Sequence, residues 1–218
     1  PAVTLALALR RPHDVPARRV LPYWGAQLAG ALLAGLVVLA VFTPFLDRFN
    51  HEHALTRGAP GSEASAMVFG EYFPNPAIFG TDDAAHALVS PALACAVEAL
   101  GTAILVFMIF ALVDPRSGVA PGLAPLLIGF TVAVLISLFA PITQAGWNPA
   151  RDLGPRLVAL LAGYGAIAIP GPLGGFWVYI VGPLVGGPVG GALYDLLRPR
   201  VPTRAAPEAA PERERTAV

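Results

Sequence analysis

The sequence predicts an all-α membrane protein in which four helices span the bilayer and two shorter helices end inside it. Three observations favour this class: hydrophobic residues make up 56% of the 218 residues, charged residues make up only 13%, and the apolar residues form long runs. A soluble domain carries about 25% charged residues. The shortfall therefore indicates a surface that faces lipid rather than a larger buried core.

Four apolar runs are long enough to cross a bilayer, which takes roughly 20 residues. We expect the spanning helices at Val20–Leu46, Ala84–Val113, Pro121–Ile142 and Leu173–Leu193. Small residues recur four positions apart within these runs, as in GAQLAGALLAG, and this spacing lets helix backbones approach closely in lipid. Close packing is sufficient to explain the small residues, so they are not evidence for a function.

Two further apolar segments, Pro1–Leu9 and Pro149–Gly163, are too short to span and read as re-entrant or buried helices. Both open with Pro-Ala, and both place a leucine four residues after the proline, at Leu5 and Leu153. Proline suits the first turn of a helix because its missing N–H would have no partner there. The shared pattern favours two related halves of the chain.

Arginine is distributed unevenly between the links that join these segments. The link RRPHDVPARRV holds four arginines, and Arg116 and the C-terminal end add more, whereas Asp47–Asp83 has two arginines against six acids. The positive-inside rule places the arginine-rich links and the C-terminus in the cytoplasm. We expect one membrane domain over residues 1–200, and a disordered tail over 201–218 because that stretch lacks an apolar face.

A few polar residues interrupt the apolar runs. Gln27 is expected to form an interhelical hydrogen bond, and Glu98 lies in mid-span, where an isolated carboxylate is costly. The single Cys95 allows no disulfide framework, and the HEH triplet at 51–53 offers two histidines without a third metal ligand. No nucleophile set or Gly-rich phosphate loop occurs. We therefore predict no enzyme activity, cofactor, metal site or nucleic-acid partner.

The stretch NPARDLGPR, which begins at Asn148, resembles the second Asn-Pro-Ala signature of the aquaporin and aquaglyceroporin family. PAVTLALAL resembles the continuation of the first signature without its Asn, and AQLAGALLAG, VEALGTAILVFMIFAL and YIVGPLVGGPVGGALYD follow in the family's order over residues 1–197. The family fold has six spans and two half-helices in inverted repeats. The resemblance implies that this chain supplies spans three to six and both half-helices, and that the first two spans are missing from it.

The resemblance also implies roles for individual residues. The signature residues are Pro1, Ala2, Asn148, Pro149 and Ala150. They lie at the ends of the two half-helices, where a positive region in the middle of the pore opposes cations and hydronium. The narrow outer filter is expected at Ile136, Ala145, Gly146 and Arg151. Backbone carbonyls from Thr143 and Gln144 onward are expected to line the solute track, and Glu98 is expected to hold the backbone N–H groups of that loop.

The resemblance also indicates, in part, which solute the protein conducts. Asp152 and Arg156 are typical of glycerol facilitators, and Ile136 stands where strict water channels have His. Ala145, where glycerol facilitators usually have Phe, and Trp147 disagree with that pattern. We predict a passive channel for glycerol and water that excludes protons and ions, in a cell membrane that is bacterial, as the family's typical homotetramer. A water-selective channel, a channel for urea, ammonia or peroxide, a proton-coupled transporter using Glu98, and a non-conducting scaffold remain alternatives.

Overall fold

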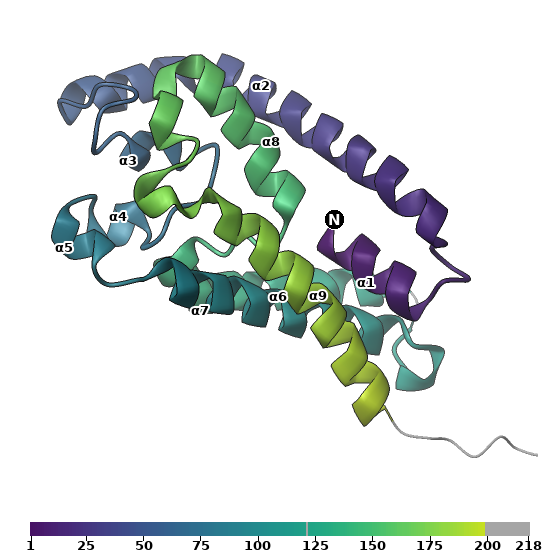
Figure 1. Cartoon of the computed structure of the whole chain (residues 1–218). Coiled ribbons are helices and arrows are strands. Elements are labelled where there is room, and N and C mark those ends of the chain that lie inside the picture. Colours follow the sequence, from purple (N-terminus) through teal and green to yellow (C-terminus); the bar gives the residue numbers. More distant parts are fainter. Residues whose placement is uncertain (121, 199–218) are drawn as a thin grey trace, which may run out of the picture.

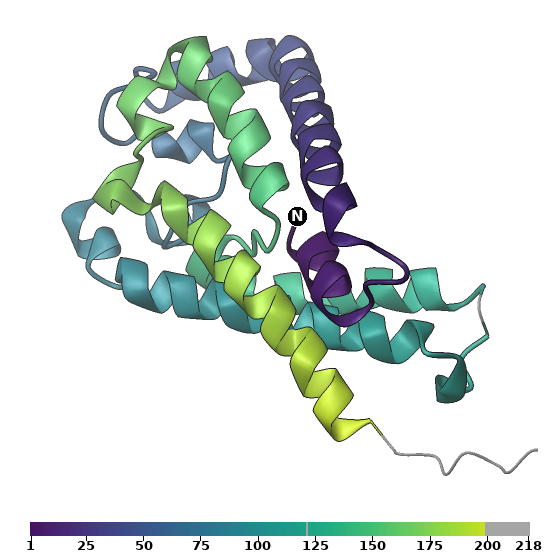
Figure 2. The same ribbon diagram turned by 45° about the vertical axis from the view of Figure 1, so that its right-hand side comes forward.

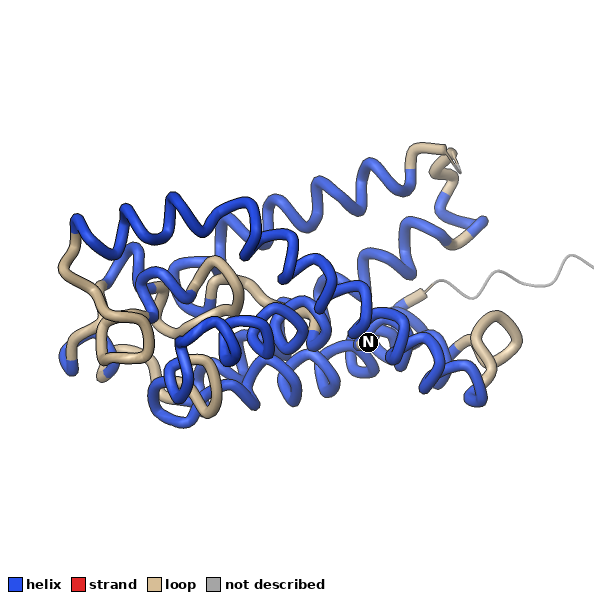
Figure 3. Tube along the Cα trace, turned by 90° about the horizontal axis from the view of Figure 1, so that it is seen from above, coloured by secondary structure: helices blue, strands red, loops and turns tan. Residues whose placement is uncertain are grey.

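The computed structural model describes residues 1–120 and 122–198, and these two ranges contain helices and loops but no strand (Figure 3). The expected tail over 201–218 and Pro121, the first residue of the third expected span, lie outside the described residues. Four helices are long and apolar enough to cross a membrane: α2 (Val20–Glu52), α6 (Pro91–Val113), α7 (Ala124–Thr143) and α9 (Val178–Leu197). The predicted all-α class with four spans is confirmed.

The starts of the second and last spans differ most from the prediction, and the third span begins at Ala124. The second span begins at Pro91 and not at Ala84, because the Ser90 hydroxyl accepts a hydrogen bond from the Leu93 N–H at 3.2 Å and Pro91 occupies the first turn. The preceding residues form a separate short helix, α5 (Asp83–His86). The last span begins at Val178, because the residues before it adopt a 3₁₀ segment, η5 (Pro172–Trp177), which contains non-helical backbone.

Two shorter helices, α1 (Ala2–Arg10) and α8 (Pro149–Ala159), point their N-terminal ends toward each other in the middle of the molecule. Figures 1 and 2 both place the start of α1 beside the start of α8, between α2 on one side and α6 and α9 on the other. Helix α8 packs along α2, and α1 packs along α9. Each short helix is therefore held by a span from the other half of the chain.

Glycines at the helix crossings explain how the helices come so close. A Cβ atom at Gly154 of α8 would lie 2.8 Å from the carbonyl carbon of Ala31 on α2, and one at Gly182 of α9 would lie 2.7 Å from the Cβ atom of Glu98 on α6. These distances are shorter than real Cβ contacts allow, so any side chain would force the helices apart. Small residues at crossings are the usual solution in lipid, where van der Waals packing drives helix association.

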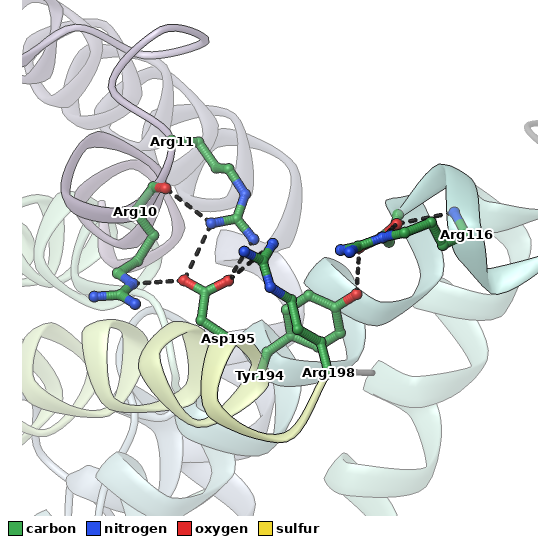
Figure 4. Close-up of polar contacts among 7 residues, drawn as sticks. Arg10, Arg11, Arg116, Tyr194, Asp195 and Arg198 are labelled. Atoms are coloured by element: carbon green, nitrogen blue, oxygen red, sulfur yellow. Dashed lines mark hydrogen bonds and ion pairs between the residues drawn. The ribbon is translucent and has the colours of Figure 1, made fainter. Parts of the chain in front are cut away.

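Polar contacts at one end of the bundle fix the direction of α1 (Figure 4). Asp195 on α9 accepts hydrogen bonds from Arg10 Nε and Arg11 Nη2, both at 2.7 Å. Tyr194 donates to Asp114 at 2.5 Å. The hydrogen bonds from Arg116, with that from Tyr194, hold the pKa of Asp114 well below its usual range. This arginine-rich end ties the last turn of α1 to α9, so the first turn of α1 stays aimed at α8.

The connection between α2 and α6, residues 53–90, covers the opposite end of the bundle and is called the outer connection below. It contains α3 (Glu63–Ala66), α4 (Pro76–Phe79) and α5. Asn75 anchors it to the end of α7: its backbone N–H donates to Pro141 O at 3.1 Å and its side chain donates to Ala140 O at 3.0 Å. Carbonyls in the last turn of a helix lack helical partners, so the Asn75 N–H satisfies Pro141 O, whereas Ala140 O also accepts from Gln144 N at 3.0 Å.

Candidate functional site

A cavity of about 420 Å³ lies where α1 and α8 meet. Helices α1, α2, α6 and α7, the segment before α8 and the first turn of α8 all contribute to its wall. Its lining residues are Pro1, Ala2, Val3, Thr4, Gln27, Leu105, Val132, Ile136, Ala145, Gly146, Trp147, Asn148 and Arg151. The cavity therefore combines aliphatic side chains from the spans with the N-terminal ends of both short helices.

Asn148 is the N-cap of α8. Its backbone is extended, and its side-chain oxygen accepts hydrogen bonds from the N–H groups of Ala150 at 3.0 Å and Arg151 at 3.3 Å. Pro149 takes the first helical position, where proline costs nothing. Because the oxygen is used in capping, the NH₂ group of Asn148 is the part of the side chain left to donate to a solute.

The start of α1 faces the same cavity from the other half of the chain. The carbonyl of Pro1 accepts from Leu5 N at 2.9 Å and from Trp24 Nε1 at 3.1 Å, which fixes this end against α2. Gln27 of α2 donates to the Thr4 hydroxyl at 3.0 Å, an interhelical hydrogen bond of the kind expected for this residue. Two helix N-termini, each equivalent to about half a positive charge, thus converge on one space.

The segment that leads into α8 has an unusual backbone. Gln144, Ala145 and Trp147 have φ values of 59°, 59° and 48°, in the left-handed region that side chains with a Cβ disfavour by about 1–2 kcal/mol each. Glu98, which is 0% exposed, accepts hydrogen bonds from Gly146 N at 3.0 Å and Trp147 N at 2.6 Å. Both oxygens of this carboxylate are bound to the loop backbone and stabilise its strained course.

Arg151 follows Asn148 by one helical turn and lines the cavity with about half of its side chain exposed. It forms an ion pair with Glu71 of the outer connection, whose side chain is only 6% exposed. Sequence reasoning did not identify Glu71 as a site residue. It is one of six acids between Asp47 and Asp83, and no pattern distinguishes it from the others.

Several predicted residues lie outside the cavity wall. Thr143 is buried, and Gln144 uses its side-chain oxygen to accept from Tyr72 N at 2.6 Å, so the segment 145–148 provides the loop surface of the cavity. Asp152 and Arg156 do not line the cavity either and form a buried ion pair at 2.7 Å.

Trp147 lines the cavity and is 5% exposed, although the sequence marked it only as an exception to the family pattern.

Within residues 1–120 and 122–198, no group of three His, Cys, Asp or Glu side chains is arranged to hold a metal ion. Tyr72 lies in the outer connection, where burial raises the pKa of its phenol well above the usual value. The phenol therefore remains neutral and donates a hydrogen bond to Ile167 O at 3.1 Å. The lining of the cavity itself offers hydrogen-bond donors, aliphatic surface and one arginine, and these groups suit binding and passage of a solute.

Comparison with known proteins gives consistent matches along the chain. The model of the family described as Major intrinsic protein matches residues 1–194. A propanediol uptake facilitator from Citrobacter freundii is 40% identical over 200 residues, which cover 90% of this chain and 69% of that protein. A glycerol uptake facilitator protein from Pseudomonas aeruginosa is 39% identical over 221 residues, covering 99% of this chain and 74% of that protein.

A solved structure has the same arrangement of helices. The X-ray structure of the aquaglyceroporin from Plasmodium falciparum superimposes with a TM-score of 0.71 and 25% sequence identity. The match covers 90% of this chain and 70% of that one. The short helices and spans described above therefore follow a known architecture over most of the chain.

Proposed function

The chain belongs to the major intrinsic protein family, and from this premise we propose that it forms a passive channel for glycerol and water. The named relatives are uptake facilitators for propanediol and glycerol, which are small uncharged polyols. They support a polyol as the main solute. The chain spans 69% and 74% of the length of these two relatives, so the activity is proposed for the protein as a whole.

The observation that best supports the proposal is the meeting of α1 and α8 at a cavity bounded by the spans. Asn148 and Arg151 supply donors on one side, while Leu105, Val132 and Ile136 supply aliphatic surface on another. A polyol has hydroxyl groups that accept such bonds and a carbon backbone that fits the aliphatic wall. Water can use the same donors.

The electrostatics of the cavity support exclusion of ions and protons. The positive ends of two helix dipoles and the guanidinium of Arg151 all raise the potential in the cavity. No carboxylate is among the described residues that line the cavity: Glu98 is bound to backbone N–H groups, and Glu71 offsets part of the charge of Arg151 through their ion pair. A cation or hydronium ion would therefore meet the positive potential of the two helix ends. A neutral solute meets no such barrier.

Glu98 supports the channel rather than proton coupling. A proton carrier must exchange its proton with water or with a relay partner, and Glu98 is 0% exposed with both oxygens bound to the backbone. We also propose that the arginine-rich end faces the cytoplasm, in line with the positive-inside rule, and that the channel assembles as a homotetramer. A reporter fused to the C-terminus and cross-linking in membranes test these two points.

Stopped-flow light scattering on proteoliposomes tests the proposed function. Vesicles exposed to a glycerol gradient first shrink as water leaves and then swell as glycerol enters. We expect both phases to be faster than in protein-free vesicles. If only the water phase accelerates, the protein is a water-selective channel, and faster swelling only with urea or peroxide would assign it to those solutes.

A further inference from the structure

The ion pair between Asp152 and Arg156 is a fully buried polar feature near the cavity, although neither residue lines it. Their side chains are 0% and 1% exposed, and Arg156 Nη2 lies 2.7 Å from Asp152 Oδ1. Charges in such a setting are costly unless hydrogen bonds satisfy them. The destinations of those hydrogen bonds therefore indicate what the pair does.

Both members of the pair hold the backbone of Glu71. Asp152 Oδ1 accepts a hydrogen bond from Glu71 N at 2.8 Å, and Arg156 Nη2 donates to Glu71 O. The preceding residue, Gly70, permits this approach, because a Cβ atom there would lie 3.0 Å from Arg156 Nε. The peptide groups on both sides of the Glu71 Cα atom are thus fixed by one buried pair.

The guanidinium group of Arg156 is itself held rigidly. Its Nε donates to Asp152 Oδ2 at 2.9 Å, and its Nη1 donates to Ala168 O at 2.9 Å. The Cζ atom of Arg156 lies 4.9 Å from the ring centre of Tyr72 and 5.6 Å from that of Tyr179. A planar group with contacts at its edge and its faces has little freedom to turn, so the grip on Glu71 is also rigid.

The side chain of Glu71 transmits this position to the cavity. Its carboxylate pairs with Arg151, which lines the cavity, and its second oxygen has no hydrogen-bond partner among the described residues. Arg151 is therefore held by a residue whose own backbone is fixed by the Asp152–Arg156 pair, which is called the clamp below. If the clamp loosened, the half-exposed Arg151 side chain would be free to move into the cavity.

We propose that Asp152 and Arg156 are positioning residues for the outer filter: they fix Glu71 so that its carboxylate holds Arg151 against the wall and leaves room for a polyol. This inference rests on the proposed channel function and gives a physical role to two residues that face no solute. A long side chain released into the cavity would obstruct glycerol more than the smaller water molecule. The ratio of glycerol to water permeability is therefore the quantity that the clamp controls.

A double-mutant cycle tests the inference on the protein in proteoliposomes. The variants are Asp152→Asn, Glu71→Gln and the two combined, with Arg156→Lys as a second way to weaken the pair. Glu63→Gln is the matched control, because Glu63 is a buried carboxylate of the same outer connection (2% exposed) that pairs with His86 instead. Glycerol and water permeability are measured for each variant in the same vesicles.

We expect Asp152→Asn, Arg156→Lys and Glu71→Gln each to lower the glycerol-to-water ratio by at least about twofold, the scale of coupling between contacting residues. The double variant should match Glu71→Gln alone, because Asp152 acts through Glu71. Glu63→Gln should leave the ratio unchanged. A ratio unchanged in both Asp152→Asn and Arg156→Lys, or additive effects in the double variant, would overturn the inference.

A second readout separates this inference from the proposed function and does not require solute flux. Amide hydrogen exchange of the peptide that contains Glu71 should be faster in Asp152→Asn and in Arg156→Lys than in the parent protein, and unchanged in Glu63→Gln. If the parent protein passes no glycerol, the channel proposal fails, and this exchange measurement still decides whether the pair holds Glu71. Exchange that is equal in all variants would contradict the clamp.

Discussion

Replacing Glu98 tests whether one buried carboxylate holds the loop that forms the cavity wall. In Glu98→Ala, the N–H groups of Gly146 and Trp147 lose their acceptors at 3.0 and 2.6 Å in a fully buried place. Each unsatisfied buried donor costs about 1–3 kcal/mol, so the total loss is about 2–6 kcal/mol. Glu98→Gln retains one acceptor oxygen and should lose about half of that.

Thermal unfolding in detergent, followed by tryptophan fluorescence, measures the effect. A loss of 1 kcal/mol lowers the midpoint by about 2–4 °C in a chain of this size, so Glu98→Ala should unfold at least about 4 °C below the parent. The matched control is Thr102→Val, because Thr102 is also 0% exposed on α6 but donates only within its own helix, to Glu98 O at 2.7 Å. Its midpoint should fall by less than that of Glu98→Ala.

The same variants distinguish a structural role from proton transfer. If Glu98 holds the loop, stability and glycerol permeability fall together, and more in Glu98→Ala than in Glu98→Gln. A midpoint in Glu98→Ala equal to that of the parent would refute the reasoning. Loss of flux in Glu98→Gln with full stability, and only under a pH gradient, would instead indicate a proton carrier.

Three further substitutions probe the filter, the helix crossings and the arginine-rich end. Arg151→Ala should raise the permeability to larger polyols and to cations by about tenfold or more, since a charge and a long side chain leave the cavity; flux assays with both kinds of solute check this, and unchanged selectivity would show that the filter lies elsewhere. Gly154→Ala should cost about 1–3 kcal/mol by overpacking against Ala31, whereas Gly129→Ala, which meets no atom within 4 Å in the described part of the chain, should cost far less in thermal unfolding. Asp195→Asn should cost about 1 kcal/mol, because its partners Arg10 and Arg11 are partly exposed at 39% and 26%; an unchanged melting midpoint would mean that these contacts do not hold α1.

Features that depend on local chemistry were predictable from the sequence. The N-cap at Asn148 follows from a side chain bonding to backbone N–H groups two and three residues away, and Pro149 marks the first turn. The number and approximate positions of the spans follow from apolar runs, although α2 continues to Glu52, beyond the predicted end at Leu46. The start of α6 was predicted too early because the residues after Asp83 are also apolar, although the Ser90–Pro91 pair carries the signal for the true start.

Contacts between distant segments were not predictable in the same way. Glu71 meets Arg151 only because the outer connection folds back over α8, and its position there depends on buried bonds to Asp152 and Arg156. The sequence identified the latter two residues by their resemblance to glycerol facilitators but could not show that they face away from the cavity. Such placements depend on tertiary packing, which hydropathy and spacing do not encode.

The dependence of glycerol flux on the pH gradient and on glycerol concentration tests the central claim most directly. Proteoliposomes are loaded with a pH-sensitive dye, and glycerol entry and internal pH are followed in the same stopped-flow experiment. A passive channel predicts flux that rises in proportion to the glycerol gradient, is the same with and without a pH gradient, and moves no protons. Flux that saturates and requires a pH gradient, accompanied by a change in internal pH, would contradict the account.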